Sequence, residues 1–229
     1  MSVLNPTTYL DLVQRTHSEC SIQGSAPSVL SNSLGINLSL WYWVNESWKW
    51  LQGLRPDWHF MHRSNLSFVT VAGQVEYTAT QAGVTEGAVT AWIPSRFRVY
   101  QTSAGQSSEV RMAYHDYREW IDAYHISSLR TAQRYPYNFS IAPNQSLMIE
   151  CPLVGYTITG EYYRAVTGFE EEDDEPTGLD AEDRMILVYK AMEFYANDQN
   201  APEVLATAQK EQKRILNRLD IRRLDRLVT

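Results

Sequence analysis

The chain has 229 residues, enough for one large domain or two small ones. Hydrophobic residues make up 44% of it, which supports a real core, and its formal net charge is −7. This charge argues against a protein that reads a DNA sequence, because such proteins are usually basic. It does not argue against a channel through which DNA slides without sticking.

The cysteines and the apolar runs predict a protein made in a reducing cytoplasm and not inserted into a membrane. Cys20 and Cys151 lie far apart and fit neither a metal knuckle nor a disulfide framework, so both are expected to be buried thiols. The segment 1–6 has no basic region and no long apolar run, so no signal peptide is predicted. No apolar run approaches the roughly 18 residues that a membrane helix needs.

Residues 1–62 are predicted to form an N-terminal helical part. The first helix is expected over Thr7–Ile22, with Asn5 as its cap. A second helix is expected over Leu38–Leu54, capped by Asn37. This second helix is apolar over a wide arc, so it needs cover on two sides.

The two apolar sides of the second helix have different residues. One side contains Leu40, Val44, Trp48 and Leu51, and the other contains Trp43, Ser47, Trp50 and Leu54. In a monomer, this pattern indicates a central helix. In a ring, one side would face the helix's own subunit, and Trp43, Trp50 and Leu54 would face the neighbouring subunit.

Residues 63–168 show the period of β-strands, with short apolar runs separated by turn residues. We predict a hairpin over Phe68–Tyr77, a strand region over Val89–Tyr100 interrupted by Pro94, and a short helix over Asp116–Ala123. Two more strands are expected over Leu147–Ile149 and Tyr156–Tyr163. Many short strands of this kind favour a central antiparallel β barrel or sandwich.

Residues 169–229 return to helix after six consecutive acidic residues, Glu170–Glu175. This acidic run is expected to be a solvated, mobile linker, because it lacks the spacing and the central glycine of a calcium loop. A helix is then predicted from Leu179 or Asp180, with acids in its first turn, and a last helix from Pro202 to about Leu227. The fold class is therefore α+β, with N- and C-terminal helices forming one bundle.

The last helix combines a thin apolar stripe with an excess of basic residues. These basic residues are Lys210, Lys213, Arg214, Arg218, Arg222, Arg223 and Arg226. One interpretation is an ordinary exposed helix, since basic residues favour helix C-termini. The other is a docking element for an acidic partner surface, with DNA as an alternative partner.

No group of residues with catalytic or metal-binding chemistry is predicted to be functional. His59 and His62 lie three positions apart, but zinc needs further ligands that the neighbouring sequence does not offer. The pairs His115–Asp116 and Asp122–His125 have no nucleophile beside them, and Ser107–Ser108 lacks the G-x-S-x-G context. No phosphate-binding glycine loop occurs. We therefore expect no enzyme activity, no cofactor and no metal.

The order of these motifs resembles the head–tail adaptor proteins of tailed bacteriophages, the group that includes tail tubular protein A-like proteins. The resemblance is carried by an ordered series of segments that covers most of the chain. The series begins with the early helix ending near Cys20 and ends with the terminal helix. Between them, in the family's order, are Trp41–Gln52 closed by Trp58–Phe60, Phe68–Tyr77, Pro136–Ile149, the tyrosine-rich Gly155–Arg164 with the acidic, proline-ended run behind it, and Asp183–Ala196. The segment from Ala104 to Arg134 matches no part of the family pattern.

The resemblance implies a structural role at the head–tail junction of a virion. About twelve copies would form a ring below the portal protein, extend the DNA channel and help to retain the packaged genome. The ring would also carry the next tail component, such as a nozzle or stopper, while genomic DNA passes without sequence-specific binding. The basic residues of the last helix would then dock on the portal.

Two other functions stay open from the sequence. A β-rich carbohydrate- or cell-wall-active domain would use the seven Trp and fourteen Tyr residues to stack on sugars. A monomeric nucleic-acid-binding module would act through the basic last helix.

Overall fold

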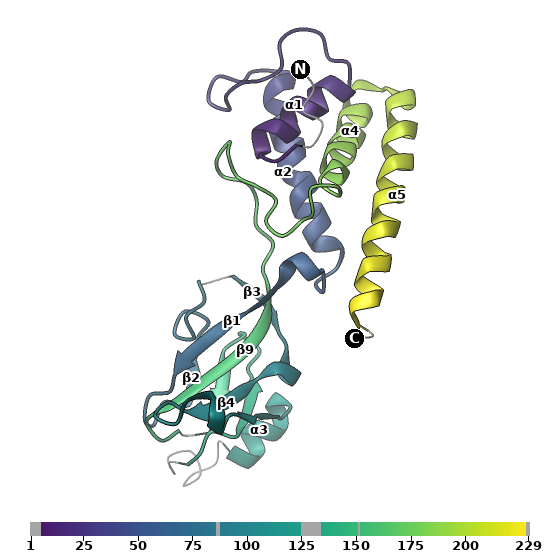
Figure 1. Ribbon diagram of the computed structural model, residues 1–229. Coiled ribbons are helices and arrows are strands. Elements are labelled where there is room, and N and C mark those ends of the chain that lie inside the picture. Colours follow the sequence, from purple (N-terminus) through teal and green to yellow (C-terminus); the bar gives the residue numbers. More distant parts are fainter. Residues whose placement is uncertain (1–5, 86–87, 125–133, 151, 228–229) are drawn as a thin grey trace. The chain divides into compact units, whose positions relative to one another are not determined.

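A computed structural model describes residues 6–85, 88–124, 134–150 and 152–227, with side chains up to residue 222 (Figure 1). The chain divides into two compact units. Met1–Phe60 and Val166–Thr229 together form a helical unit, and Met61–Ala165 forms a β unit. The β unit is thus inserted between the two halves of the helical unit, which unites segments far apart in the sequence.

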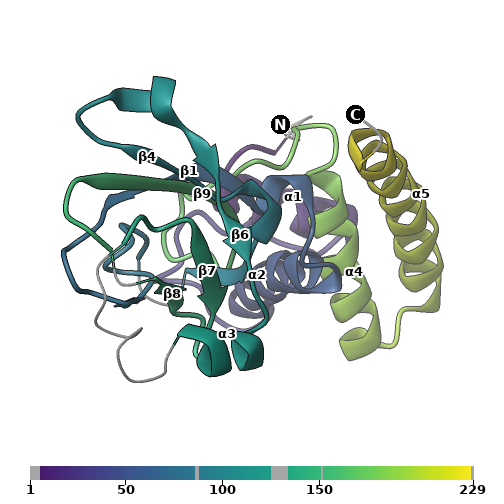
Figure 2. The ribbon, with the colours of Figure 1, turned by 90° about the horizontal axis from the view of Figure 1, so that it is seen from below.

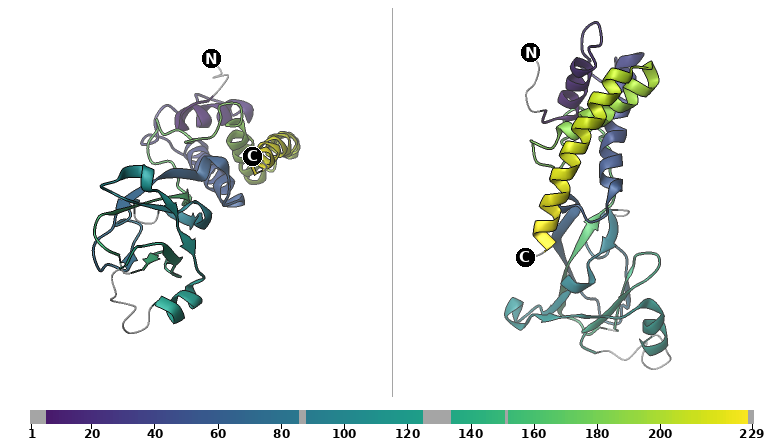
Figure 3. Two further views of the ribbon diagram at one scale, coloured as in Figure 1. Left: turned by 60° about the horizontal axis from the view of Figure 1, so that its bottom comes forward. Right: turned by 90° about the vertical axis from the view of Figure 1, so that its right-hand side faces the viewer.

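The helical unit contains four helices: α1 (Tyr9–Glu19), α2 (Ile36–Leu54), α4 (Met185–Gln199) and α5 (Pro202–Leu227). Helix α4 lies at its centre, because α1, α2 and α5 all pack on it and α1 also packs on α2. The views in Figures 2 and 3 agree that α5 runs along α4. The predicted bundle of N- and C-terminal helices is confirmed.

The beginnings of the helices differ from the sequence predictions. Helix α1 begins after Thr8, whose hydroxyl accepts a hydrogen bond from the Asp11 backbone N–H, so Thr8 and not Asn5 is its cap; Asn5 lies outside the described residues. Helix α2 begins after Gly35, which places Asn37 inside the helix. Helix α4 begins only at Met185 and has no acid in its first turn.

Aromatic and aliphatic side chains fill the core of the helical unit. Trp48 is 2% exposed, and its ring packs against those of Phe60 and Phe169, with centroids 5.6 and 6.0 Å away. The other buried residues of the four helices include Tyr9, Leu12, Val13, Leu40, Val44, Leu51, Ile186, Leu187, Val188, Ala191, Met192, Ala208, Ile215 and Leu219. The self-facing side predicted for α2 is therefore confirmed as core.

The β unit has two sheets. The first contains β1 (His62–Val69), β9 (Tyr156–Arg164), β4 (Arg98–Gln101) and β5 (Val110–Arg111) in this order, with β3 (Val89–Trp92) also paired to β9. The second contains β2 (Glu76–Tyr77), β8 (Leu147–Ile149), β7 (Asn138–Ile141) and β6 (Ala113–Tyr114). All these pairs are antiparallel except β6 with β7.

One prediction for the β unit was wrong in detail. The turn near Gly73 exists, but β1 pairs with β9 and β2 pairs with β8, so Phe68–Tyr77 is not a hairpin. Neither sheet closes into a barrel, because each ends in edge strands. The strands on both sides of Pro94 and the short helix α3 (Tyr117–Tyr124) are confirmed.

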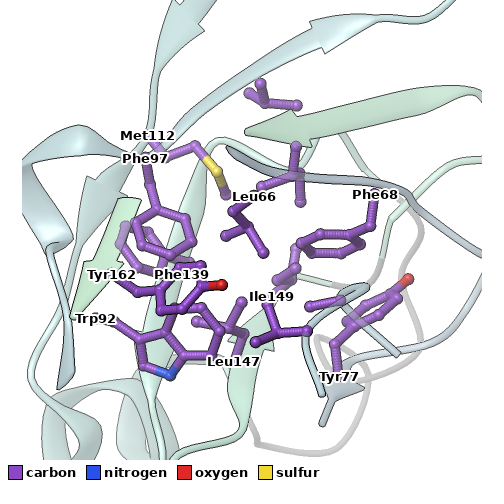
Figure 4. Packing of buried hydrophobic residues seen from close by; sticks show 14 of the residues in the cluster. Leu66, Phe68, Tyr77, Trp92, Phe97, Met112, Phe139, Leu147, Ile149 and Tyr162 are labelled. Carbon is purple, nitrogen blue, oxygen red and sulfur yellow. The ribbon is translucent and has the colours of Figure 1, made fainter. Parts of the chain in front are cut away.

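The two sheets share one hydrophobic core, which is the arrangement of a sandwich. Figure 4 shows Leu66 and Phe97 from the first sheet region facing Phe139 and Ile149 from the second. The rings of Phe97 and Phe139 are stacked, with centroids 4.6 Å apart. This contact between side chains from distant parts of the sequence holds the two sheets together.

Candidate assembly interface

The second apolar side of α2 is covered in part by α4 of the same chain. The ring of Trp43 lies edge-on to Tyr195, with centroids 6.2 Å apart, and the ammonium of Lys190 lies 4.7 Å from the ring centre of Trp50. Both tryptophans are half-buried. Leu54 is 44% exposed. Of the three residues predicted to face a neighbour, Leu54 is therefore the one with the most open surface.

Helix α5 buries one narrow stripe against α4. Ala208, Ile215 and Leu219 are nearly inaccessible to solvent, at the seven- and four-residue spacing of one helix face. The opposite face is exposed and carries Lys210 and Lys213. The thin apolar stripe predicted from the sequence is thus real, and it leaves most of the helix surface uncovered within this chain.

Two of the predicted docking residues on α5 hold a buried carboxylate of their own chain. The Asp183 side chain is 0% exposed and accepts hydrogen bonds from Arg218 Nε at 2.7 Å and Arg222 Nη1 at 2.6 Å. Arg222 Nη1 also lies 3.0 Å from Asp180 Oδ2. Since a buried carboxylate is costly without partners, these arginines fasten α5 to the segment before α4.

The other basic residues of α5 make no described contact with Asp183. Arg214 is 70% exposed and reaches Glu211 of the same helix at 2.8 Å. Lys210 and Lys213 are exposed, and no ion pair is found for either among the described residues. The side chains of Arg223 and Arg226 lie outside the described residues. The seven predicted residues therefore do not form one uniform surface.

The acidic run was predicted to be a solvated, mobile linker, and most of its side chains are exposed, but its backbone is bonded to α1. The backbone carbonyls of Asp174 and Glu172 accept hydrogen bonds from the N–H groups of Tyr9 and Leu10, at 2.7 and 2.9 Å. These N–H groups lie in the first turn of α1, where a helix cannot satisfy its own donors. The acidic run satisfies them and is held in place, an arrangement that local periodicity could not predict.

Side chains add to this attachment. The Asp174 carboxylate accepts hydrogen bonds from the backbone N–H groups of Glu170 and Glu171, at 2.6 and 2.8 Å. The Glu172 carboxylate accepts one from the Leu30 N–H at 2.5 Å. Arg184 joins Glu175 Oε2, at 3.0 Å, to the carbonyl of Thr7, at 2.8 Å. The run is thus a rigid element with outward carboxylates at Glu170, Glu171 and Asp173.

Sequence reasoning missed Asp180 and Asp183 as partners of α5. One signal was available, because Asp180 and Asp183 are three positions apart and Arg218 and Arg222 are four apart. Side chains three or four positions apart can lie close enough to contact the same partner segment. Without knowing that α4 and α5 are antiparallel neighbours, however, the two pairs could not be matched.

The histidines and serines considered for chemistry have structural partners. The His62 ring binds Glu161 at 2.7 Å, and the His115 ring binds the Asn138 side-chain oxygen at 2.9 Å. The hydroxyls of Ser107 and Ser108 donate hydrogen bonds to backbone carbonyls of their own turn. No site with three or more His, Cys, Asp or Glu side chains that could hold a metal occurs within the described ranges.

The two cysteines and two further candidate histidines, His59 and His125, complete the set. The His59 ring lies edge-on to that of Phe60, with centroids 5.5 Å apart. Cys20 is buried and free, and burial raises the pKa of its thiol to about 12, so the thiol is unreactive at neutral pH. Cys151 and His125 lie outside the described residues. In the part of the chain that the structure describes, no helix is long and apolar enough to cross a bilayer.

Comparison with known proteins agrees with this architecture. The chain has no match among curated proteins. The family model described as the SU10 adaptor protein matches residues 7–228, nearly the whole chain including the helical unit and the β unit. An adaptor family of this kind indicates a structural role in the virion. The chain therefore belongs to the SU10 adaptor protein family and is a phage head–tail adaptor.

Proposed function

We propose that this adaptor forms a ring of about twelve copies below the portal protein, extends the DNA channel and helps to retain the packaged genome. The ring would also be the platform for the next tail component, such as a nozzle or stopper. The observation that carries this proposal is the family match over residues 7–228. The protein would act in the virion at the head–tail junction, after synthesis in the host cytoplasm.

The distribution of charge supports a channel role. The helical unit has twelve basic and nineteen acidic residues, whereas the β unit has eight of each, so the whole net charge of −7 belongs to the helical unit. A ring repeats this acidic unit in every copy. Acidic surfaces repel the phosphate backbone, so genomic DNA would pass without sequence-specific binding.

Lateral contacts between copies are proposed at the second side of α2. Leu54 is exposed and would touch a neighbouring copy directly, and Trp43 and Trp50 would support this surface through their contacts with α4. Heterologous side-to-side contacts of this kind close into rings.

Portal docking is proposed for the last helix. The predicted set is Lys210, Lys213, Arg214, Arg218, Arg222, Arg223 and Arg226. Of these, Arg218 and Arg222 also stabilise the helical unit through Asp183. The docking proposal therefore concerns mainly the end of α5 beyond Arg222, which carries Arg223 and Arg226.

A short truncation tests docking without unfolding the helical unit. Deleting residues 223–229 keeps the contacts of Arg218 and Arg222 with Asp183 and the pair between Arg55 and Asp220, whose atoms lie 3.1 Å apart. We expect the truncated protein to keep its melting temperature within a few degrees and to lose binding to portal-containing capsids. Normal docking by the truncated protein would place the portal contact elsewhere.

A further inference from the structure

The outer face of α5 is a basic surface that pairs with no other helix among the described residues, since its one ion pair joins Arg214 to Glu211 of α5 itself. Lys210, Lys213 and Arg214 lie three and four positions apart, so they share one side of the helix. Ile221, two turns further on, is 61% exposed. The ion pairs that fasten α5 to its own chain involve Arg218, Arg222 and Asp220 instead. The outer face is therefore available for contact.

The acidic run is a second surface of the helical unit, with the opposite charge. Glu170, Glu171 and Asp173 are exposed, and their backbone is fixed on the first turn of α1. Among the described ion pairs of the helical unit, none joins 170–175 to α5. The run is attached to α1, whereas α5 packs on α4, so the two surfaces remain separate within one chain.

We propose that the basic outer face of α5 in one copy docks on the acidic run 170–175 of the next copy. This inference rests on the proposed ring and names one of its subunit interfaces. Two different complementary surfaces on one molecule form a head-to-tail contact, which is the kind that closes into a ring. Opposite charges on the two surfaces fix the register and orientation of the copies and speed their encounter.

Rigidity of both surfaces favours this contact. The acidic run is held by backbone hydrogen bonds at 2.7 and 2.9 Å, and α5 is held by its buried stripe and by Asp183. Little backbone freedom is therefore lost when two copies meet. Ile221 adds an apolar contact beside the charges.

A charge swap tests the interface with three variants. The first changes Lys210, Lys213 and Arg214 to Glu, and the second changes Glu170, Glu171 and Asp173 to Lys. The third combines all six changes. Among the described hydrogen bonds, no side chain of these six residues takes part in the contacts of Asp183, Glu172 or Asp174, and the substitutions keep the backbone N–H groups of Glu170 and Glu171 that Asp174 accepts from. Glu203→Lys, on the exposed first turn of α5, is the matched control.

The measurement is the extent of ring formation on portal-containing capsids, by cross-linking and electron microscopy, with a thermal melt of each free variant. We expect each three-residue variant to weaken ring formation by about tenfold or more, because attraction becomes repulsion at several pairs. The combined variant should recover most of the ring formation, and Glu203→Lys should leave ring formation unchanged.

The outcomes separate this interface from the ring itself. A wild-type protein that forms no ring overturns the proposed function as well. A normal ring in either three-residue variant, or no recovery in the combined variant, overturns only the interface. A third outcome is that ring formation is lost when the basic face of α5 is changed but not when the acidic run is changed. This would mean that the basic face binds the portal, and it would also overturn the interface.

Discussion

Asp183 shows how single residues decide the shape of the helical unit. Its carboxylate is fully buried and pairs with two arginines from α5. These ion pairs add to the few apolar contacts that the narrow stripe of α5 makes. A buried ion pair contributes little net stability compared with apolar packing, but it strongly penalises any arrangement that leaves the charge alone. The pair therefore fixes where α5 lies on α4.

Replacing Asp183 by Asn should destabilise the helical unit by about 2–3 kcal/mol, because two partly exposed arginines lose their counter-charge. Glu182→Gln is the control. Glu182 is 75% exposed and lies 3.4 Å from Arg222, so its loss should cost less than about 1 kcal/mol. Urea unfolding of both variants measures this difference. Equal effects would show that the Asp183 contacts do not hold α5.

Glu150 gives the β unit a predictable dependence on pH. Burial raises the pKa of its carboxyl, while the hydrogen bond from Asn138 and the charges of Arg134 and His115 act in the opposite direction. A carboxyl whose pKa is raised by folding keeps its proton up to a higher pH in the folded state than in the unfolded state. Its contribution to stability is therefore present at low pH and is lost as pH rises from the unfolded pKa through the folded one.

Glu150→Gln should remove this pH dependence, because the amide oxygen still accepts from Asn138 but carries no charge. We expect the variant to be at least as stable as the wild type at pH 7. The wild type should lose stability as the pH rises above 4.5, and the variant should not. Thermal melts between about pH 4 and 8 provide the test. Parallel pH curves for both proteins would contradict it.

At the scale of the elements, α2 organises the helical unit with two sides of unequal burial. Its inner side is closed by core residues such as Trp48, and its second side rests partly on α4. An apolar arc of this width requires cover on both sides. In the structure the inner side of α2 is fully covered within the chain, and the second side is left partly exposed around Leu54.

Trp48→Ala should destabilise the free protein by about 3–5 kcal/mol, because a fully buried ring between Phe60 and Phe169 is removed. Trp43→Ala should cost less, since this ring is half-buried on Tyr195, but it should weaken ring formation. Chemical unfolding and capsid-binding assays distinguish the two effects. Equal loss of monomer stability in both variants would show that α2 is simply a central helix.

Helices were easier to predict from the sequence than the pairing of strands. The apolar period places α2 and α5 within a few residues of their observed bounds, because this signal is local. The partners of β1 and β2 are far away in the chain, so a turn at Gly73 between two apolar runs was mistaken for a hairpin. Strand pairing depends on tertiary packing that local patterns do not contain.

The candidate interface was predictable only in part, for the same reason. The basic excess on α5 and the exposed Leu54 follow from composition and periodicity. The attachment of Glu170–Glu175 to α1 does not, because it depends on free N–H groups of a helix about 160 residues earlier. A run of like charges normally indicates solvated chain, and here backbone hydrogen bonds to a helix end override that tendency.

The net charge of the molecule lies in the helical unit and not in the β unit. The helical unit carries the net charge of −7, and the β unit is neutral. An adaptor that lets DNA pass must not bind it strongly, and phosphate binding requires clustered basic residues. The basic residues of α5 stand among acidic ones, which reduces the attraction for DNA.

The free protein should therefore show no measurable affinity for duplex DNA at physiological salt. Fluorescence anisotropy with a labelled duplex of about 30 base pairs tests this, with a salt titration as control. Micromolar binding that falls steeply with salt would favour the nucleic-acid-binding interpretation of the last helix.

The central claim is a ring of this protein between the portal and the tail, and cryo-electron microscopy of purified virions tests it most directly. The account predicts density for about twelve copies directly below the portal, with the Lys210 side of α5 next to residues 170–175 of the neighbouring copy. Finding the protein on the capsid surface, or not finding it in virions at all, would contradict the account.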